Sequence, residues 1–206
     1  MSGLEIAGVV LGVIPIVQIG IEQIKGKRLK ALIKHQQTIA SFSRKFELEH
    51  ALFHANLEKL LVSISDEETA SILLVNLTGP GWKDDDLSES LQEHLGERSY
   101  QAYYSALTDL AALLAELQEE LGLDDSGNQI RVDKWSDKVA KRIKDYIKHK
   151  NHLSVLETIK ELNEALHRLT GDVLELAPIR ANRRTKLDTK RWESLRKLAE
   201  NLHDTY

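Results

Sequence analysis

Apolar residues recur at steps of three and four along most of the chain, and the longest such pattern runs from Lys27 to Ile64. This spacing predicts one long amphipathic helix whose buried stripe is polar at Gln36, Ser43 and His50. The apolar members of the stripe are Leu29, Leu32, Ile39, Phe46, Phe53, Leu57, Leu60 and Ile64, widened by Ile33, Phe42, Leu52 and Leu61.

Start and stop signals divide the middle of the chain into shorter helices. The sequence SDEE, which begins at Ser65, has the form of a capping box and predicts a helix that continues to the breaker TGPGW. The acidic triplet Asp84–Asp86 suits the first turn of a short helix that ends near Gly96. A further helix begins with RSYQ and stops at Gly122.

The last third of the chain continues the helical pattern after a loop, LDDSGNQIRVD. Helical spacing runs from Trp135 to Thr170, with a break near Asn151 and a stop at Gly171. Pro178 then separates this segment from a last amphipathic helix, whose apolar positions are Trp192, Leu195, Leu198 and Leu202.

Composition supports a helical fold, because aromatic residues make up only 5% of the chain and three prolines leave room for long helices. We therefore predict an all-α protein, an antiparallel helical bundle forming a single domain over residues 1–206. Residues 1–24 supply an apolar N-terminal helix and residues 25–206 the amphipathic helices. The absence of cysteine excludes disulfides and thiolate metal sites and favours a reducing, intracellular setting.

Charge is strongly segregated along the chain. Residues 46–125 carry 18 acidic and 3 basic side chains, whereas residues 25–45 carry seven basic and no acidic ones. The stretch Arg180–Lys197 holds eight basic and two acidic residues around Trp192 and could contact nucleic acid or anionic lipid. We favour the simpler interpretation that Trp192 belongs to the core and the charges face solvent or the acidic region, without nucleic-acid binding.

Candidate chemical sites are weak. His50 and His54 have the spacing of two zinc ligands, but Ala51 stands where a metalloprotease needs its glutamate, so His50 is expected in a polar layer of the bundle. Asp84–Asp86 lacks the alternating oxygen ligands of a calcium loop, and helix capping explains it better. GVVLGVIP lacks the lysine of a phosphate-binding loop. We expect no enzyme activity, no metal and no cofactor.

The N-terminal segment is the most apolar part of the chain, with Gln18 as the only polar side chain between Ile6 and Ile21. Sixteen helical residues reach about 24 Å, short of a ~30 Å hydrocarbon core. Positive charges follow the apolar run rather than precede it, unlike a signal peptide. They suit a helix that enters a membrane from the cytosol, and the expected headgroup contacts are Lys25, Lys27, Arg28, Lys30 and Lys34.

Glycines and a proline give this segment two possible roles. Gly8 and Gly12 form a G-x-x-x-G pair that permits close helix approach in lipid, whereas Gly20 lies roughly 120° around the helix from Gly8. Pro15 is unfavourable within a helix in water but tolerated in membranes. Alternatively, the segment is the buried central helix of the bundle, which is the preferred interpretation for a resting soluble state.

Three stretches carry a resemblance to a known group: MSGLEIAGVVLGVIPIV, GPGWKDDDLSESLQEHLGERSYQAYYSALTDL, and LGLDD before a tryptophan-centred segment. They resemble the N-terminal HeLo-like domains of fungal proteins, which are related to the HeLo domain of prion-controlled incompatibility and similar to the four-helix domain of the mixed-lineage kinase-like pseudokinase. The resemblance implies a helical bundle that permeabilises membranes as a cell-death effector after another part of the protein drives oligomerisation.

In the family the N-terminal helix, with its glycine pattern, carries the membrane activity. The resemblance places this glycine pattern at Gly8 and Gly12, and less closely at Gly3 and Gly20. Family members usually continue into a sensor, kinase-like or amyloid-signalling region, so we expect an excised domain that ends at Tyr206. The expected partners are anionic membrane lipids and further copies of the chain. The expected location is the cytoplasm at rest and the plasma membrane on activation. The alternative is a soluble interaction module whose N-terminal helix stays in the core.

Overall fold

The computed structural model describes residues 2–26, 35–76, 79–123 and 152–172, together with 174, 175, 192 and 196. Within these residues the chain is helical and forms no β-strand, which confirms the predicted all-α class. The elements are α1 (Gly3–Gly26), α2 (Gln36–Ile64), α3 (Glu67–Val75), the 3-10 helix η2 (Pro80–Lys83), α4 (Asp85–Leu95), α5 (Glu97–Leu121) and a helix over residues 152–172.

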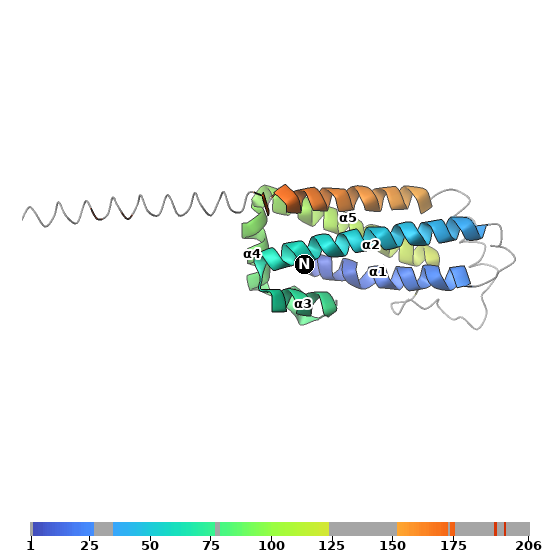
Figure 1. The fold of residues 1–206 in the computed structure, drawn as a ribbon, viewed down its shortest axis with the longest axis horizontal. Coiled ribbons are helices and arrows are strands. Elements are labelled where there is room, and N and C mark those ends of the chain that lie inside the picture. The colour runs from blue at the N-terminus through green and yellow to red at the C-terminus, as the bar shows by residue number, and fades with distance from the viewer. Residues whose placement is uncertain are drawn as a thin grey trace, which may run out of the picture. The chain divides into compact units, whose positions relative to one another are not determined.

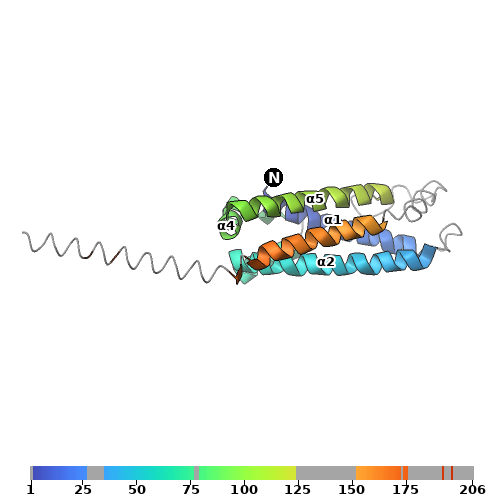
Figure 2. The ribbon, with the colours of Figure 1, turned by 90° about the horizontal axis from the view of Figure 1, so that it is seen from above.

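Contacts divide the chain into two compact units, Met1–Thr170 and Gly171–Tyr206, and the bundle is the first of them. Four long helices lie along one another in this unit (Figure 1). α1 and α5 run in one direction, and α2 and the 152–172 helix run in the other (Figures 1 and 2). Successive long helices are therefore antiparallel, whereas α1 and α5, which pack closely, are parallel neighbours.

The long helix α2 buries one face in the bundle, through Ile39, Phe42, Phe46, Phe53, Leu57, Leu60 and Leu61. Two details of the sequence prediction are wrong. The helix begins at Gln36 rather than Lys27, since His35 occupies its N-cap position, and residues 27–34 lie outside the described part. Leu52 does not widen the buried stripe, because its side chain is exposed on the outer face of α2.

Carboxylates cap the two helices that come next. The N-cap of α3 is Asp66, whose side chain accepts a hydrogen bond from the Thr69 amide at 2.8 Å, and this bond lowers the pKa of Asp66. The prediction that Ser65 begins the helix is wrong by one residue, since Ser65 ends α2 and its hydroxyl donates to the Leu61 carbonyl. Asp84 caps α4 by accepting from the Asp86 and Leu87 amides, which confirms the capping role assigned to the acidic triplet.

Glycines end the next two helices where the backbone requires a positive φ. Gly96 separates α4 from α5 with φ of 76°, and Gly122 ends α5 in the left-handed region with φ of 66°. Both positions agree with the helix ends that the sequence predicts. The loop expected after Gly122 and the break near Asn151 lie outside the described residues.

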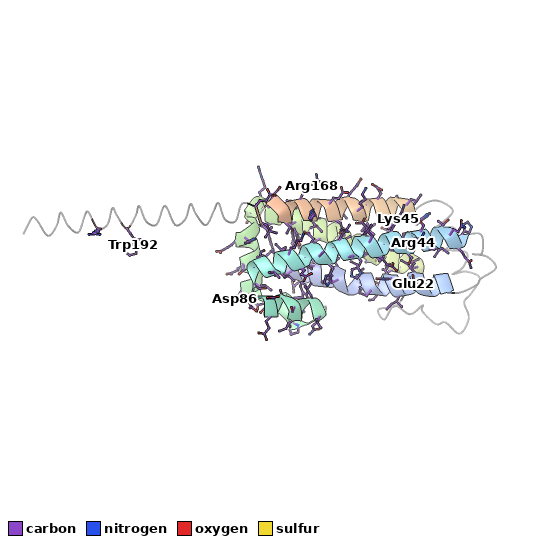
Figure 3. All side chains as sticks on the ribbon, in the orientation of Figure 1. Glu22, Arg44, Lys45, Asp86, Arg168 and Trp192 are labelled. Carbon is purple, nitrogen blue, oxygen red and sulfur yellow. The ribbon has the colours of Figure 1, made fainter. Side chains whose placement is uncertain are left out.

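The second unit holds few described residues. Trp192 is helical there and 72% exposed (Figure 3), and the expectation that it belongs to a core stays a prediction. Most of the basic stretch Arg180–Lys197 lies outside the described residues.

Candidate functional site: the N-terminal helix α1

Helix α1 begins with a capping box that the sequence analysis missed. The Ser2 hydroxyl accepts a hydrogen bond from the Glu5 amide at 3.2 Å, and the Ser2 amide donates to the Glu5 carboxylate at 2.7 Å. The S-x-x-E spacing could have revealed it. The Gly3 amide also donates to the Tyr100 hydroxyl at 3.3 Å, which joins the start of α1 to α5.

Most apolar side chains of α1 are buried in the bundle, namely Leu4, Ile6, Ala7, Val10, Leu11, Ile14, Val17 and Ile21. Two large apolar side chains of α1 are exposed instead, Val9 at 44% and Ile19 at 46%. The 20 residues Gly3–Glu22 form the one helix in the described part of the chain that is long and apolar enough to cross a membrane. At about 1.5 Å per residue they reach roughly 30 Å, so the 16-residue estimate was too short. A core helix of a soluble protein meets the same criterion, and 56% of this segment is buried.

Gly8 is a point of close contact between α1 and the 3-10 helix η2. A Cβ atom at Gly8 would lie 2.8 Å from Cγ and 2.9 Å from Cδ2 of Trp82, so the indole packs directly on the glycine backbone. Trp82 is 3% exposed, and its Nε1 donates to the Asn76 carbonyl at 3.0 Å, which fixes the ring. In the bundle, Gly8 therefore accommodates an aromatic side chain, a role that sequence analysis did not assign to it.

The other predicted residues of the inserting helix have different surroundings. Gly20 is buried against the methyl groups of Leu123, which a Cβ would displace. A Cβ at Gly3 would meet Leu91 and Tyr100 at an ordinary 3.5 Å. Gly12 and Pro15 are half-buried within α1, which continues through the proline. Gly8 therefore packs against Trp82 and Gly20 against Leu123, so the two glycines do not share one contact surface.

The second half of α1 is joined to α2 by a hydrogen bond. The Ser43 hydroxyl donates to Glu22 Oε1 at 2.7 Å, and Ser43 is buried (Figure 3 labels Glu22). Lys25 lies in the last turn of α1. The other predicted headgroup contacts, Lys27, Arg28, Lys30 and Lys34, lie outside the described residues.

A buried polar pair joins α2 to the 152–172 helix beside α1. The Asn163 amide nitrogen donates to the Glu49 backbone carbonyl at 3.0 Å and to its carboxylate at 2.9 Å, and both side chains are buried. They line a small cavity with Ile14 of α1 and with His50. His50 lines the same cavity, and its place in a polar layer stays a prediction, whereas the buried pair of Glu49 and Asn163 was not predicted from sequence.

Replacing Asn163 with alanine is expected to lower the free energy of unfolding by about 2–3 kcal/mol, because it removes two hydrogen bonds and leaves a buried carboxylate without this donor. Urea unfolding followed by circular dichroism measures the change. The control is Glu164→Ala, an exposed neighbour on the same helix, which should change it by less than about 0.5 kcal/mol. Equal losses for the two variants would contradict a stabilising role of the buried Asn163–Glu49 pair.

Acidification is expected to destabilise the bundle through His50. Burial, with a smaller contribution from the charge of nearby His54, lowers the pKa of His50 below 6.5, so the folded chain favours the neutral ring. The unfolded chain then binds more protons below this pH, and the free energy of unfolding should fall as pH is lowered from about 7.5 to about 5.5. Urea unfolding at several pH values should show a shallower dependence for His50→Gln. An unchanged dependence would exclude His50 as its source.

The described residues around α1 hold the helix through packing and hydrogen bonds. His50 and His54 lie with ring centroids 6.5 Å apart, and no third histidine or carboxylate among the described residues completes a metal site with them. The candidate site is therefore the apolar helix α1 itself, together with the contacts that hold it in the bundle. Comparison of the chain with protein-family models, curated proteins and solved structures gives no match.

Proposed function

We propose that this chain is a membrane-targeting domain that permeabilises membranes when α1 leaves the bundle and inserts into lipid. The observation that carries the proposal is that Gly3–Glu22 forms one uninterrupted apolar helix of membrane-spanning length at the start of the chain. The five basic residues from Lys25 to Lys34 come directly after it and would remain with anionic headgroups.

Insertion would retain some contacts of α1 and break others. The capping box of Ser2 and Glu5 lies entirely at the start of α1, so it can travel with the helix and satisfy backbone amides in lipid. The Tyr100 and Ser43 hydrogen bonds and the packing of Gly8 on Trp82 would be lost. In return, lipid would cover Val9 and Ile19, which water reaches in the bundle.

The biological setting that we propose rests on the resemblance to HeLo-like domains. The chain would act as a fungal cell-death effector of the incompatibility or immune type, cytoplasmic at rest and at the plasma membrane after activation. Anionic lipids and other copies of the chain would be its partners. A sensor or regulatory region outside this chain would supply the oligomerising signal.

The second candidate is a soluble helical interaction module in which α1 never leaves the core. The fit of Trp82 onto Gly8 favours it, because this contact explains the glycine without any membrane. An experiment that holds α1 in the bundle separates the two candidates. A membrane-targeting domain would lose its permeabilising activity, whereas a soluble module would have no such activity to lose.

The deciding experiment holds α1 in the bundle chemically rather than deleting it, since deletion would remove a core helix. The chain has no cysteine, so Glu22→Cys with Ser43→Cys supplies a unique thiol pair at the contact between α1 and α2. A short bifunctional thiol reagent bridges them, and dye release from anionic vesicles is compared before and after bridging. The protein carries an artificial oligomerising domain in both cases.

We expect dye release by the open protein and its loss after bridging, with circular dichroism unchanged. Release that persists after bridging would show that α1 need not leave the bundle. No release by either form would favour the soluble module. The single-cysteine variants, treated with the same reagent, control for effects of modification alone.

A further inference from the structure

We propose that the helix of residues 152–172 detaches from α2 before any other long helix leaves the bundle, and that this opening precedes the release of α1. The buried face of the helix is the first evidence. Six of its side chains are buried, at steps of four and three, and half of them are polar: His152, Leu156, Ile159, Asn163, Leu166 and Thr170. A strict stripe of this kind is narrow, and most of the helix surface lies outside it.

The neighbouring long helices are held by more apolar side chains. The 152–172 helix buries three of them, and Val155, Leu162 and Leu169 are only half-buried. By contrast, α1 buries eight hydrophobic side chains and α5 seven. Because the transfer of apolar side chains from water is the main force that holds packed helices together, the 152–172 helix is the one that leaves most easily.

Buried polar groups are concentrated where this helix meets α2. Apart from tyrosine and tryptophan, every buried polar side chain in the described residues lies on one of these two helices. Asn163 donates to Glu49, whereas Ser43 bonds instead to α1. The two helices run in the same direction (Figures 1 and 2), so Asn56 and Thr170, each seven residues further on, lie at one level. We call this contact, with Glu49, Asn56, Asn163 and Thr170, the polar seam.

Water would satisfy groups of the polar seam that the folded bundle leaves unsatisfied. The Oδ1 atoms of Asn56 and Asn163 are buried and have no hydrogen-bond partner in the part of the chain that the structure describes. A buried polar atom without a partner is costly, and the cost disappears once water reaches it. Hydration of the polar seam therefore offsets part of the apolar contact that is lost when the helix detaches.

Detachment would open the bundle beside α1. Ile159 and Asn163 line the same small cavity as Ile14 of α1, together with Phe46 and Phe53 of α2. Once the 152–172 helix leaves, water reaches this side of α1, while Trp82 still packs on Gly8. The order of events, with this helix first and α1 second, rests on the proposed function. The detachment itself does not, because it requires no lipid.

Amide hydrogen exchange of the wild-type chain without lipid tests the detachment. A single helix of this length is marginal in water, so the 152–172 helix loses its backbone hydrogen bonds once it leaves the bundle. After correction for intrinsic rates, we expect amides of residues 156–166 to exchange at least about tenfold faster than those of residues 10–17 and 107–117. They should also share one degree of protection, because the helix leaves as a unit.

Two results of this measurement would overturn the proposal. One is protection of residues 156–166 equal to that in the middle of α1 and α5. The other is protection that rises steadily from the ends of the 152–172 helix to its middle, as fraying would produce.

An apolar replacement tests the cause of the opening. Glu49→Leu with Asn163→Leu should slow the exchange of residues 156–166 at least about tenfold, because it adds apolar contact and removes a buried carboxylate and an unpaired amide oxygen. Glu58→Leu with Glu164→Leu makes matched changes at exposed positions of the same two helices and should leave exchange unchanged. Exchange that is not slowed in the first variant would overturn the role of the polar seam. The wild-type measurement decides the detachment even if this variant does not fold.

Dye release from anionic vesicles, with the artificial oligomerising domain attached, tests the order of events. The Glu49→Leu, Asn163→Leu variant should lose most of the release that the wild type shows, and the exposed control should retain it. Full release by a variant whose exchange is slowed would overturn the order, because α1 would then leave without this opening. Absence of release by the wild type would bear on the proposed function alone, since hydrogen exchange is measured without lipid.

Discussion

Trp82→Ala is expected to lower the free energy of unfolding by about 3–5 kcal/mol, since it empties the space that the indole fills against Gly8 and removes a hydrogen bond to the Asn76 carbonyl. For a unit of this size the melting temperature should fall by roughly 2–4 °C per kcal/mol. If retention of α1 controls membrane activity, the variant should also release vesicle dye at lower protein concentration than the wild type. Thermal melting and dye release on the same samples measure both effects.

A pair of glycine variants separates this contact from general damage to α1. Gly8→Leu should destabilise the bundle by about 1–3 kcal/mol through overpacking against Trp82. Gly3→Ala should be nearly neutral, because its Cβ would make only ordinary contacts. Combining Gly8→Leu with Trp82→Ala should cost less than the sum of the two single variants, since the leucine can occupy part of the vacated space. Additive costs would show that the two positions do not share this contact.

Reversing Lys27, Arg28 and Lys30 to glutamate is expected to weaken binding to anionic vesicles by at least about 3 kcal/mol, or roughly 150-fold. Each basic residue near an anionic surface contributes about 1 kcal/mol, and a glutamate adds repulsion. Binding to neutral vesicles should change little. Vesicle co-sedimentation at low salt measures the effect, which should shrink as added salt screens the surface.

The matched control applies the same change of net charge to exposed residues outside this segment, Lys59, Lys83 and Arg98. If the flank of α1 meets the membrane, this control should bind anionic vesicles more tightly than the flank variant. Equal affinity of the two triple variants would mean that overall charge governs binding. Equal affinity of the flank variant and the wild type for anionic vesicles at low salt would show that these basic residues do not contact the headgroups.

Much of the local structure of the described residues could be predicted from the sequence. Three-four spacing identified the long helices, because a helix that buries one face must repeat its apolar residues at about 3.6 positions. Gly96 and Gly122 marked helix ends because both adopt positive φ, which other residues rarely do. The acidic triplet was correctly assigned to capping, because capping is a local interaction: the Asp84 side chain accepts from amides that are just two and three residues further along the chain.

Tertiary structure decided which face of each helix meets which neighbour, and this is where the sequence interpretation failed. Periodicity could not tell that Leu52 points outward, since apolar residues occur on both faces of α2 and only packing determines which face is buried. The partnership of Asn163 with Glu49 joins residues 114 positions apart, which no local pattern encodes.

Gly8 shows the same division most clearly. Its spacing from Gly12 is a property of α1 alone and suggests close helix packing wherever the helix resides. That the neighbour in the bundle is the indole of Trp82 depends only on the path of the chain, which brings η2 against α1. The sequence by itself thus determined that α1 is an apolar helix able to approach a neighbour closely. The folded bundle determined which neighbour it is, because close packing is a relation between surfaces that lie far apart along the chain.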